Sequence, residues 1–208
     1  MPTKVYLEIA NKKVFACAVD WPGWARSGKT EEDALAALAE YAPRYAVIAE
    51  RAGLRFPKSA GDAFDVRERV AGNGTTEFGA PAISPELDAG EIKKAEATRL
   101  AKLLRAAWDE FDAVSAKSPA ELRKGPRGGG RDRDKMVGHV RDSEVGYARV
   151  IGVKERPDGD LREDILAVLG RPGDGTAPGR KGWPIRYAAR RFTWHVLDHL
   201  WEMQDRSS

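Results

Sequence analysis

The chain has 208 residues, of which 42% are hydrophobic and 32% charged, a composition typical of a globular protein with one or two domains. It carries 35 Lys and Arg residues against 32 Asp and Glu residues, and this net charge of +3 is too small to predict a nucleic-acid partner. No apolar run approaches the roughly 18–20 residues that a membrane-spanning helix needs, so we expect no membrane partner.

The first thirty residues alternate between strand and turn signals. Segments 5–9 and 14–19 are rich in β-branched and aromatic residues, which predicts two β-strands joined by a hairpin at 10–13. A brief third strand is predicted at 25–28, after a Trp-Pro-Gly-Trp turn. Cys17 is the only cysteine, and we expect it to be a small buried residue rather than a reactive thiol. A single cysteine excludes an intramolecular disulfide and favours a reducing, cytoplasmic location.

A helix and a fourth strand are predicted next. Thr30 stands before three acidic residues, so its hydroxyl can accept a backbone amide of the first helical turn while the acids complement the helix dipole. Apolar residues then recur at helical spacing, with a kink or restart expected at Pro43 and an end at Gly53. Segment 63–70 alternates as a strand, and 72–81 is predicted to be a glycine-rich loop.

The order of these elements is strand, strand, strand, helix, strand. Together with the stretch FACAVDWPGW from Phe15 to Trp24 and the stretch GKTEEDA from Gly28 to Ala34, this order resembles the small HicB-like α/β domain. The likeness covers residues 4 to about 72. It implies a module that binds a partner or dimerises. We therefore predict that residues 1–83 form a HicB-like α/β domain.

From Ser84 onward the apolar spacing becomes helical, and serine before Pro85 is typical of a helix start. Four helices are predicted, at 84–114, 132–153, 160–169 and 183–202. The connecting segments 118–130 and 171–182 are rich in proline and glycine and are predicted to be loops. We predict that residues 84–208 form an antiparallel four-helix bundle. The predicted fold class is therefore α+β, a small α/β domain followed by a helical bundle.

The chain contains only three histidines, and two of them, His195 and His199, lie four residues apart in the last predicted helix. This spacing places both imidazoles on one helix face, from which two ring nitrogens can bind one metal ion. The third, His139, falls on the apolar face of an earlier predicted helix. A single histidine on such a face is usually a hydrogen-bonded core residue. The prediction of a metal site therefore depends on whether the three converge.

The residues between His195 and His199 include no glutamate, which distinguishes the pair from the zinc-protease motif. The segment GHVRDSE around His139 and the segment WHVLDHLWEMQDR that begins at Trp194 resemble the DinB/YfiT-like superfamily of four-helix metalloproteins. The likeness covers about 84–208. It implies that the three histidines are the ligands of one metal ion. Members of this superfamily include thiol-dependent S-transferases and isomerases and suspected hydrolases.

Three neutral imidazoles leave a tetrahedral ion one open position, as in catalytic zinc sites. Such a site lowers the pKa of a bound water or thiol and so supplies a nucleophile. Zinc is the expected metal, and nickel and iron also accept three imidazoles. By analogy we predict a metal-dependent transferase or hydrolase in which a thiol or water attacks a small electrophilic substrate. A low-molecular-weight thiol is the candidate cofactor.

Four carboxylates near the histidines in sequence are candidates for orienting the imidazole rings: Asp142, Glu144, Asp198 and Glu202. Each is equally compatible with an ordinary surface carboxylate. Arg191 lies one helical turn before His195 and is a candidate clamp for a substrate carboxylate. A solvated helix arginine is the commoner case.

Two other hypotheses stay open. In one, the HicB-like domain is a regulatory or partner-binding module and the bundle is a scaffold with a vestigial metal. A histidine site that is closed by a fourth protein ligand, or plugged by side chains, would favour it. In the other, the chain binds nucleic acid, which requires a contiguous basic face. For the leading hypothesis we expect a small-molecule substrate and, because helical bundles commonly pair, a homodimer.

Overall fold

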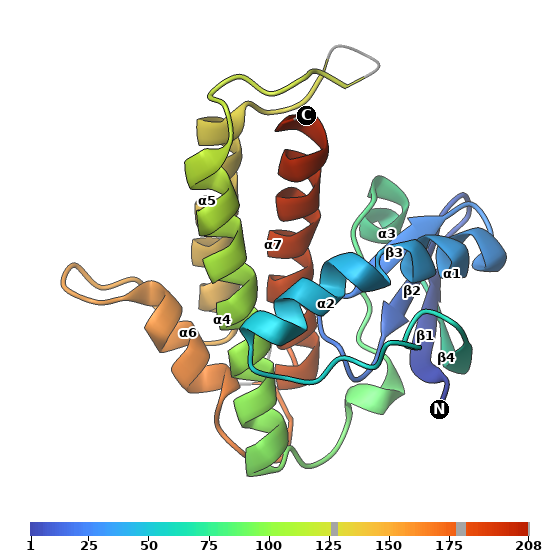
Figure 1. Cartoon of the computed structure of the whole chain (residues 1–208). Coiled ribbons are helices and arrows are strands. Elements are labelled where there is room, and N and C mark those ends of the chain that lie inside the picture. Colours follow the sequence, from blue (N-terminus) through green and yellow to red (C-terminus); the bar gives the residue numbers. More distant parts are fainter. Residues whose placement is uncertain (126–128, 178–181, 208) are drawn as a thin grey trace.

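The computed structural model describes residues 1–125, 129–177 and 182–207. These residues form a four-stranded sheet and seven α-helices, with the sheet on one side of the molecule and the long helices on the other (Figure 1). The predicted α+β class is therefore confirmed. The loops predicted at 118–130 and 171–182 lie partly outside the described residues.

The sheet consists of four strands in the spatial order β3-β2-β1-β4. Their bounds are β1 Thr3–Ile9, β2 Val14–Ala18, β3 Ala25–Gly28 and β4 Phe64–Ala71. β1 pairs antiparallel with β2 and parallel with β4. A parallel pair needs a long crossover connection, and helices α1 (Glu31–Glu40) and α2 (Ala42–Arg51) lie within it. All four predicted strands are present.

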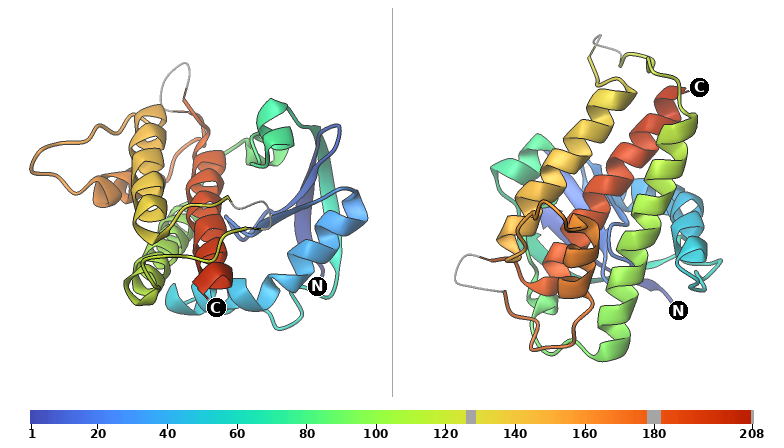
Figure 2. Two further views of the ribbon diagram at one scale, coloured as in Figure 1. Left: turned by 90° about the horizontal axis from the view of Figure 1, so that it is seen from above. Right: turned by 90° about the vertical axis from the view of Figure 1, so that its left-hand side faces the viewer.

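The two faces of the sheet are covered by different parts of the chain, because successive side chains of a strand point to opposite faces. Val5 and Leu7 of β1 belong to the main hydrophobic core. Tyr6 of β1 and Cys17 of β2 belong to a second cluster that contains Trp194 of the last helix, α7 (Ile185–Ser207). Seen from above, α7 stands between the sheet and α5 (Arg133–Val150), so both flanks of this helix are covered (Figure 2).

Local signals explain most helix boundaries in the first half. The Thr30 hydroxyl accepts from the Asp33 amide at 3.1 Å, as the capping signature predicts. Pro43 lies in the first turn of α2, where its missing amide costs no helical hydrogen bond, so the helix restarts there as predicted. Helix α3 (Gly74–Phe78) was not predicted; it lies inside the expected loop and begins at a capping box formed by Asn73 and Thr76.

The second half contains α4 (Lys94–Lys117), α5, α6 (Leu161–Leu169) and α7. In Figure 1, α4, α5 and α7 run side by side, and the short α6 leans away from them against the base of α4. α7 carries buried residues on all its sides, which is typical of a helix inside a core. Among the described residues, no helix combines the length and the apolar character needed to cross a bilayer.

The helix start predicted at Ser84 is wrong. A short 3-10 helix, η1 (Glu86–Asp88), is followed by extended chain, and α4 begins only at Lys94. The Arg186 guanidinium accounts for the difference, because it donates to backbone carbonyls of residues 88–91, the groups that a continuing helix would use internally. Gly90 has a φ of 92°, which also ends helical geometry.

The halves that the sequence divides at residue 83 share one hydrophobic core. It extends from Leu7 in the sheet through Trp24 and Trp108 to Trp201 and Met203 in α7. Trp24 is fully buried and donates from its indole nitrogen to a backbone carbonyl of α1 at 2.9 Å. The sheet is therefore packed directly against the helix that carries two of the three histidines.

Candidate metal centre

The three histidines converge between α5 and α7. The Nε2 atoms of His139 and His195 lie 3.2 Å apart, and the ring centroids of the three imidazoles are separated by 4.7 to 5.1 Å. One ring nitrogen from each histidine lies within 4.8 Å of the other two. His195 and His199 are buried, and His139 is partly exposed. The four-residue spacing in α7 and the packing of α5 against it thus bring together every histidine in the chain.

This donor set fits a divalent metal ion. In a tetrahedral zinc site with bonds near 2.0–2.1 Å, neighbouring ligand nitrogens lie about 3.3 Å apart, close to the separation of the His139 and His195 nitrogens. Among the described histidine, cysteine and acidic residues, no fourth side chain joins the cluster. An ion held by His139, His195 and His199 therefore keeps a coordination position for an external ligand.

Burial favours the neutral imidazole of His195 and His139, which is the protonation state that binds metal. Burial lowers the pKa of His195 to about 2, and the neighbouring charges of His199 and His139 act in the same direction. The pKa of His139 is also lowered, first by burial and then by the positive charge of Arg131. The cluster therefore offers free lone pairs at neutral pH.

Glu202 orients one of the three rings. Its Oε2 lies 3.1 Å from Nδ1 of His199, and its Oε1 accepts from Arg206 at 2.6 Å. The hydrogen bond with His199 is the main reason that the pKa of Glu202 is lowered. An ionised carboxylate at this distance holds the proton on Nδ1 and leaves the lone pair of Nε2 of His199 available to bind a metal ion.

The other three candidate carboxylates have different surroundings. Asp198 faces the sheet and pairs with Arg26 of β3 at 3.0 Å. Glu144 is buried and pairs with Arg162 of α6 at 3.2 Å. Asp142 is exposed and influences His139 only through its charge. Of the four, Glu202 is therefore the one whose carboxylate is hydrogen-bonded to a histidine.

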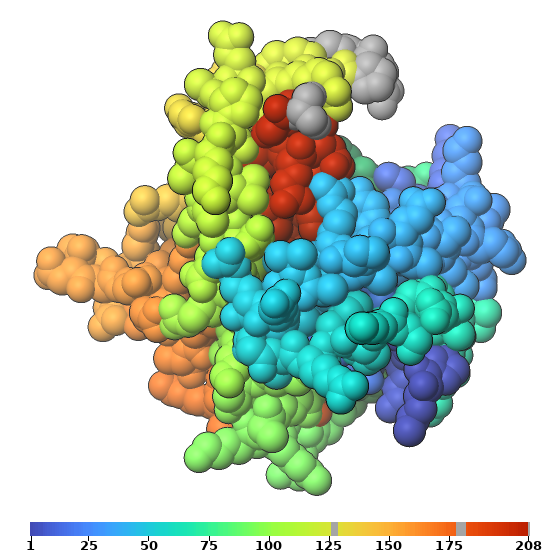
Figure 3. Space-filling model, viewed as in Figure 1, coloured from blue at the N-terminus to red at the C-terminus, as the bar shows by residue number. Residues whose placement is uncertain are grey.

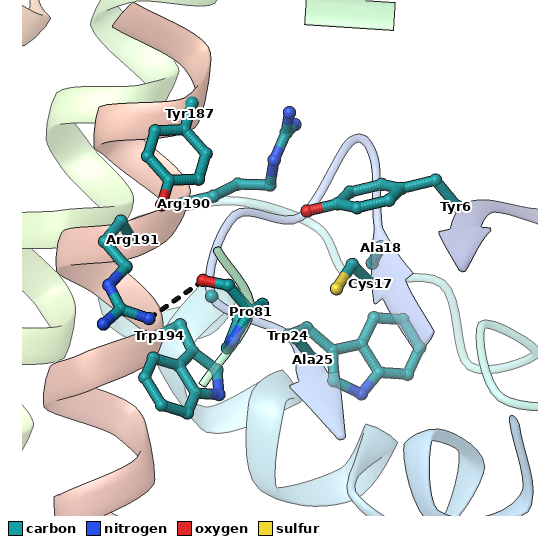
Figure 4. A pocket seen from close by; sticks show the side chains of 11 residues that line it. Tyr6, Cys17, Ala18, Trp24, Ala25, Pro81, Tyr187, Arg190, Arg191 and Trp194 are labelled. Atoms are coloured by element: carbon teal, nitrogen blue, oxygen red, sulfur yellow. Dashed lines mark hydrogen bonds between the residues drawn. The ribbon is translucent and has the colours of Figure 1, made fainter. Parts of the chain in front are cut away.

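Arg191 lies close to the centre but is partly engaged. It donates to the carbonyl of Pro81 at 2.8 Å, and its guanidinium is 5.1 Å from the Trp194 ring (Figure 4). The same guanidinium is 5.5 Å from the Tyr147 ring. A guanidinium has five N–H donors, so this bond leaves others for a ligand. Its role as a substrate clamp stays a prediction.

The sequence prediction missed Tyr147 as a neighbour of the centre. Its ring meets that of His195 edge to face, with centroids 5.6 Å apart, and Phe192 and Trp183 pack against it. Tyr147 lies eight residues after His139 on α5, a spacing that places both on one helix face. That spacing was the signal available in the sequence.

The part of α7 around Trp194 and Arg190 that faces the sheet is closed. A cavity of only about 10 Å³ lies there among Tyr6, Cys17, Trp24, Trp194 and Arg190 (Figure 4). Such a volume holds no more than one water molecule. Burial raises the pKa of the Cys17 thiol to about 12, so this cysteine is a protonated core residue, as predicted. A substrate therefore does not reach the histidines through this cavity.

Comparisons of the chain with models of protein families, with curated proteins and with solved structures found no significant match.

Proposed function

We propose that the protein binds one divalent metal ion through His139, His195 and His199. We also propose that it uses the ion to activate a thiol or water against a small electrophilic substrate. The convergence of all three histidines from two helices carries the metal-binding part of the proposal. The reaction class rests on the resemblance of residues 84–208 to the DinB/YfiT-like metalloproteins. The protein is then a metal-dependent transferase or hydrolase, with a low-molecular-weight thiol as candidate cofactor.

The energetics of the cluster support metal binding. Two ring nitrogens 3.2 Å apart in a buried site repel each other unless a proton or a cation lies between them. A single divalent ion between the rings replaces this repulsion with coordination and provides a partner for one nitrogen of each ring.

The residues of the chain then have distinct tasks. His139, His195 and His199 would hold the ion, with zinc as the first choice and nickel or iron as alternatives. When bound, the ion lowers the pKa of a water or thiol at the open position and polarises an electrophile. Glu202 fixes the proton of His199 on Nδ1. Arg191 retains N–H donors one turn from His195 with which to orient a substrate carboxylate.

The absence of a fourth protein ligand among the described residues favours this proposal over a scaffold with a vestigial metal, because a structural zinc usually has four protein ligands. The assignment of residues 1–83 as a HicB-like domain, the small-molecule substrate and the homodimer stay predictions.

Elemental analysis of untagged protein tests the metal site. We expect about one divalent ion per chain, and near-complete loss of it in His195→Ala and His139→Ala. Asp134→Asn is a matched control, because this carboxylate also lies on α5 but is exposed and pairs with Arg133. Purified protein without stoichiometric metal, or an unchanged metal content in His195→Ala, would refute the site.

The reaction class needs a separate assay. Metal-loaded protein is given a generic aromatic electrophile with and without a low-molecular-weight thiol, and hydrolysis of a generic ester is followed in parallel. We expect turnover in one of these reactions that disappears in His195→Ala. If the metal-loaded protein turns over neither substrate above the rate of free metal ion, the catalytic part of the proposal is wrong.

A further inference from the structure

A groove of about 630 Å³ lies beside the candidate metal centre. One wall comes from the sheet side (Arg26 and Tyr41), one from the end of α7 (Trp201 and Glu202), and one from the loop before α5 (Arg123). In Figure 3 the end of α7, in red, lies recessed between this yellow-green loop above and the light-blue α1 and α2 below. The volume is in the range of pockets that hold small organic ligands.

Glu202 connects the groove to the metal centre. It lines the groove, and its carboxylate oxygen lies 3.1 Å from Nδ1 of His199. With Nδ1 of His199 engaged by Glu202, an ion bound through Nε2 would be separated from the groove by this one imidazole ring. No part of the groove reaches the small closed cavity on the sheet-facing flank of α7, which has different lining residues.

Tyr41 is the aromatic side chain that the groove exposes. Its ring meets that of Trp201 edge to face with centroids 4.9 Å apart, and Trp201 itself is buried behind it. The Arg26 guanidinium, held by Asp198, lies 3.9 Å from the centre of the Tyr41 ring, and the Arg44 guanidinium lies 5.1 Å from it. Aromatic rings and a stacked guanidinium both favour contact with a flat, unsaturated ligand.

Most charges along the groove are already matched in ion pairs: Arg26–Asp198, Arg44–Asp205, Lys124–Asp132 and Arg206–Glu202. Arg123 differs from these. It is exposed and donates to the backbone carbonyl of Asp205, and no ion pair with a carboxylate forms at it among the described residues. Its backbone is fixed by a hydrogen bond to Arg206 at 2.9 Å. Among its described lining residues, the groove therefore presents one positive charge without an ion pair, that of Arg123, on an anchored segment.

We propose that this groove binds a small aromatic carboxylate, whose ring lies against Tyr41 and whose carboxylate pairs with Arg123. The idea that this carboxylate is a substrate rests on the proposed metal-dependent function. Binding of the carboxylate in the groove depends only on the residues of the groove. The planar fork of an arginine matches the two oxygens of a carboxylate. A neutral ligand of the same shape makes the ring contact and lacks the ion pair.

Benzoate and its neutral analogue benzyl alcohol are the probes, and binding to the full chain is measured by ligand-observed NMR titration. We expect benzoate to bind more tightly than benzyl alcohol. Arg123→Gln should weaken benzoate about fivefold and leave benzyl alcohol unchanged, the size expected for one exposed charge pair. Tyr41→Leu should weaken both. Arg105→Gln removes an exposed arginine elsewhere, on α4, and should change neither.

Benzoate binding to His195→Ala separates this proposal from the metal site. If the metal-free variant still binds benzoate, and Arg123→Gln weakens benzoate binding to the same extent in that background, the groove is the binding site even when the metal-dependent reaction is absent. Binding that requires the metal and is insensitive to Arg123→Gln places the carboxylate on the ion and overturns the proposal. Failure of benzoate to bind wild-type protein overturns it as well. Thermal unfolding of each variant confirms that it is folded.

Discussion

Removal of the Glu202 carboxylate should weaken metal binding although all three histidines that would coordinate the metal are kept. Glu202 accepts from Nδ1 of His199 at 3.1 Å and is itself held by Arg206 at 2.6 Å. In Glu202→Ala the imidazole loses the partner that fixes its ring orientation and the position of its proton. The ring can then rotate, and either tautomer forms, so part of the population presents no lone pair to the ion.

The magnitude follows from the chemistry of the contact and its exposure. Loss of a residue that orients a metal ligand typically lowers metal affinity by about 10–100-fold. The Glu202 side chain is 34% exposed, and water replaces part of what it provides, so we expect the lower end of that range. A tenfold change corresponds to about 1.4 kcal/mol. Glu202→Gln keeps an oxygen acceptor and loses the charge, so we expect about a threefold change.

Competition with a chromophoric zinc chelator at pH 7.5 measures these affinities. Gln204→Ala is the matched control, because this neutral side chain lies on the same helix and contacts Arg44 rather than a histidine. Urea unfolding of each apo variant separates loss of metal affinity from loss of fold. An affinity of Glu202→Ala within twofold of wild type would refute the orienting role of this carboxylate.

Two further predictions concern buried groups away from the histidines. Cys17, whose pKa is raised by burial to about 12, should not react with a disulfide reagent at pH 8 until the protein is unfolded, when one thiol per chain appears. The unfolded thiol loses its proton near pH 9, whereas the folded thiol keeps it. Ionisation of Cys17 in the unfolded state should therefore lower the free energy of unfolding as pH rises above about 9, by at most about 1.4 kcal/mol per pH unit. The same dependence of the free energy of unfolding on alkaline pH in Cys17→Ala would contradict this. Asp88 forms a buried ion pair with Arg190, so Asp88→Ala should lower the free energy of unfolding by about 3–5 kcal/mol by leaving a buried cation without its partner. The double variant Asp88→Leu with Arg190→Met should recover most of the lost free energy of unfolding, as measured by urea unfolding. A decrease below about 1 kcal/mol in Asp88→Ala would show that the ion pair does not stabilise the fold.

Much of the local structure could be predicted because its causes lie within a few residues. Short apolar runs with β-branched and aromatic residues produce β1 and β2, and Thr30 caps α1 through an amide three residues away. The Ser84 helix start failed for a non-local reason. The carbonyls that a helix would have used accept from Arg186, nearly one hundred residues later in the chain.

The candidate site shows the same division between local and distant causes. That His195 and His199 share a face follows from four-residue spacing in a helix. Proximity in sequence did not identify the orienting carboxylate. Glu144 lies five residues from His139 yet pairs with Arg162, because its helix turns that side chain toward α6. Asp198 is adjacent to His199 in sequence and points to the sheet.

The sequence by itself determined the strands, the helices other than α3 and the start of α4, the burial of Cys17 and the rarity and spacing of the histidines. Periodicity, capping and backbone preference act over a turn or a strand. Only the tertiary structure decided that His139 meets the other two, that Glu202 holds one of them, and that a charged, aromatic groove adjoins them. These depend on contacts such as Arg26 with Asp198, 172 residues apart. Such contacts form only when the sheet packs on α7, and packing is a property of the whole core rather than of any segment.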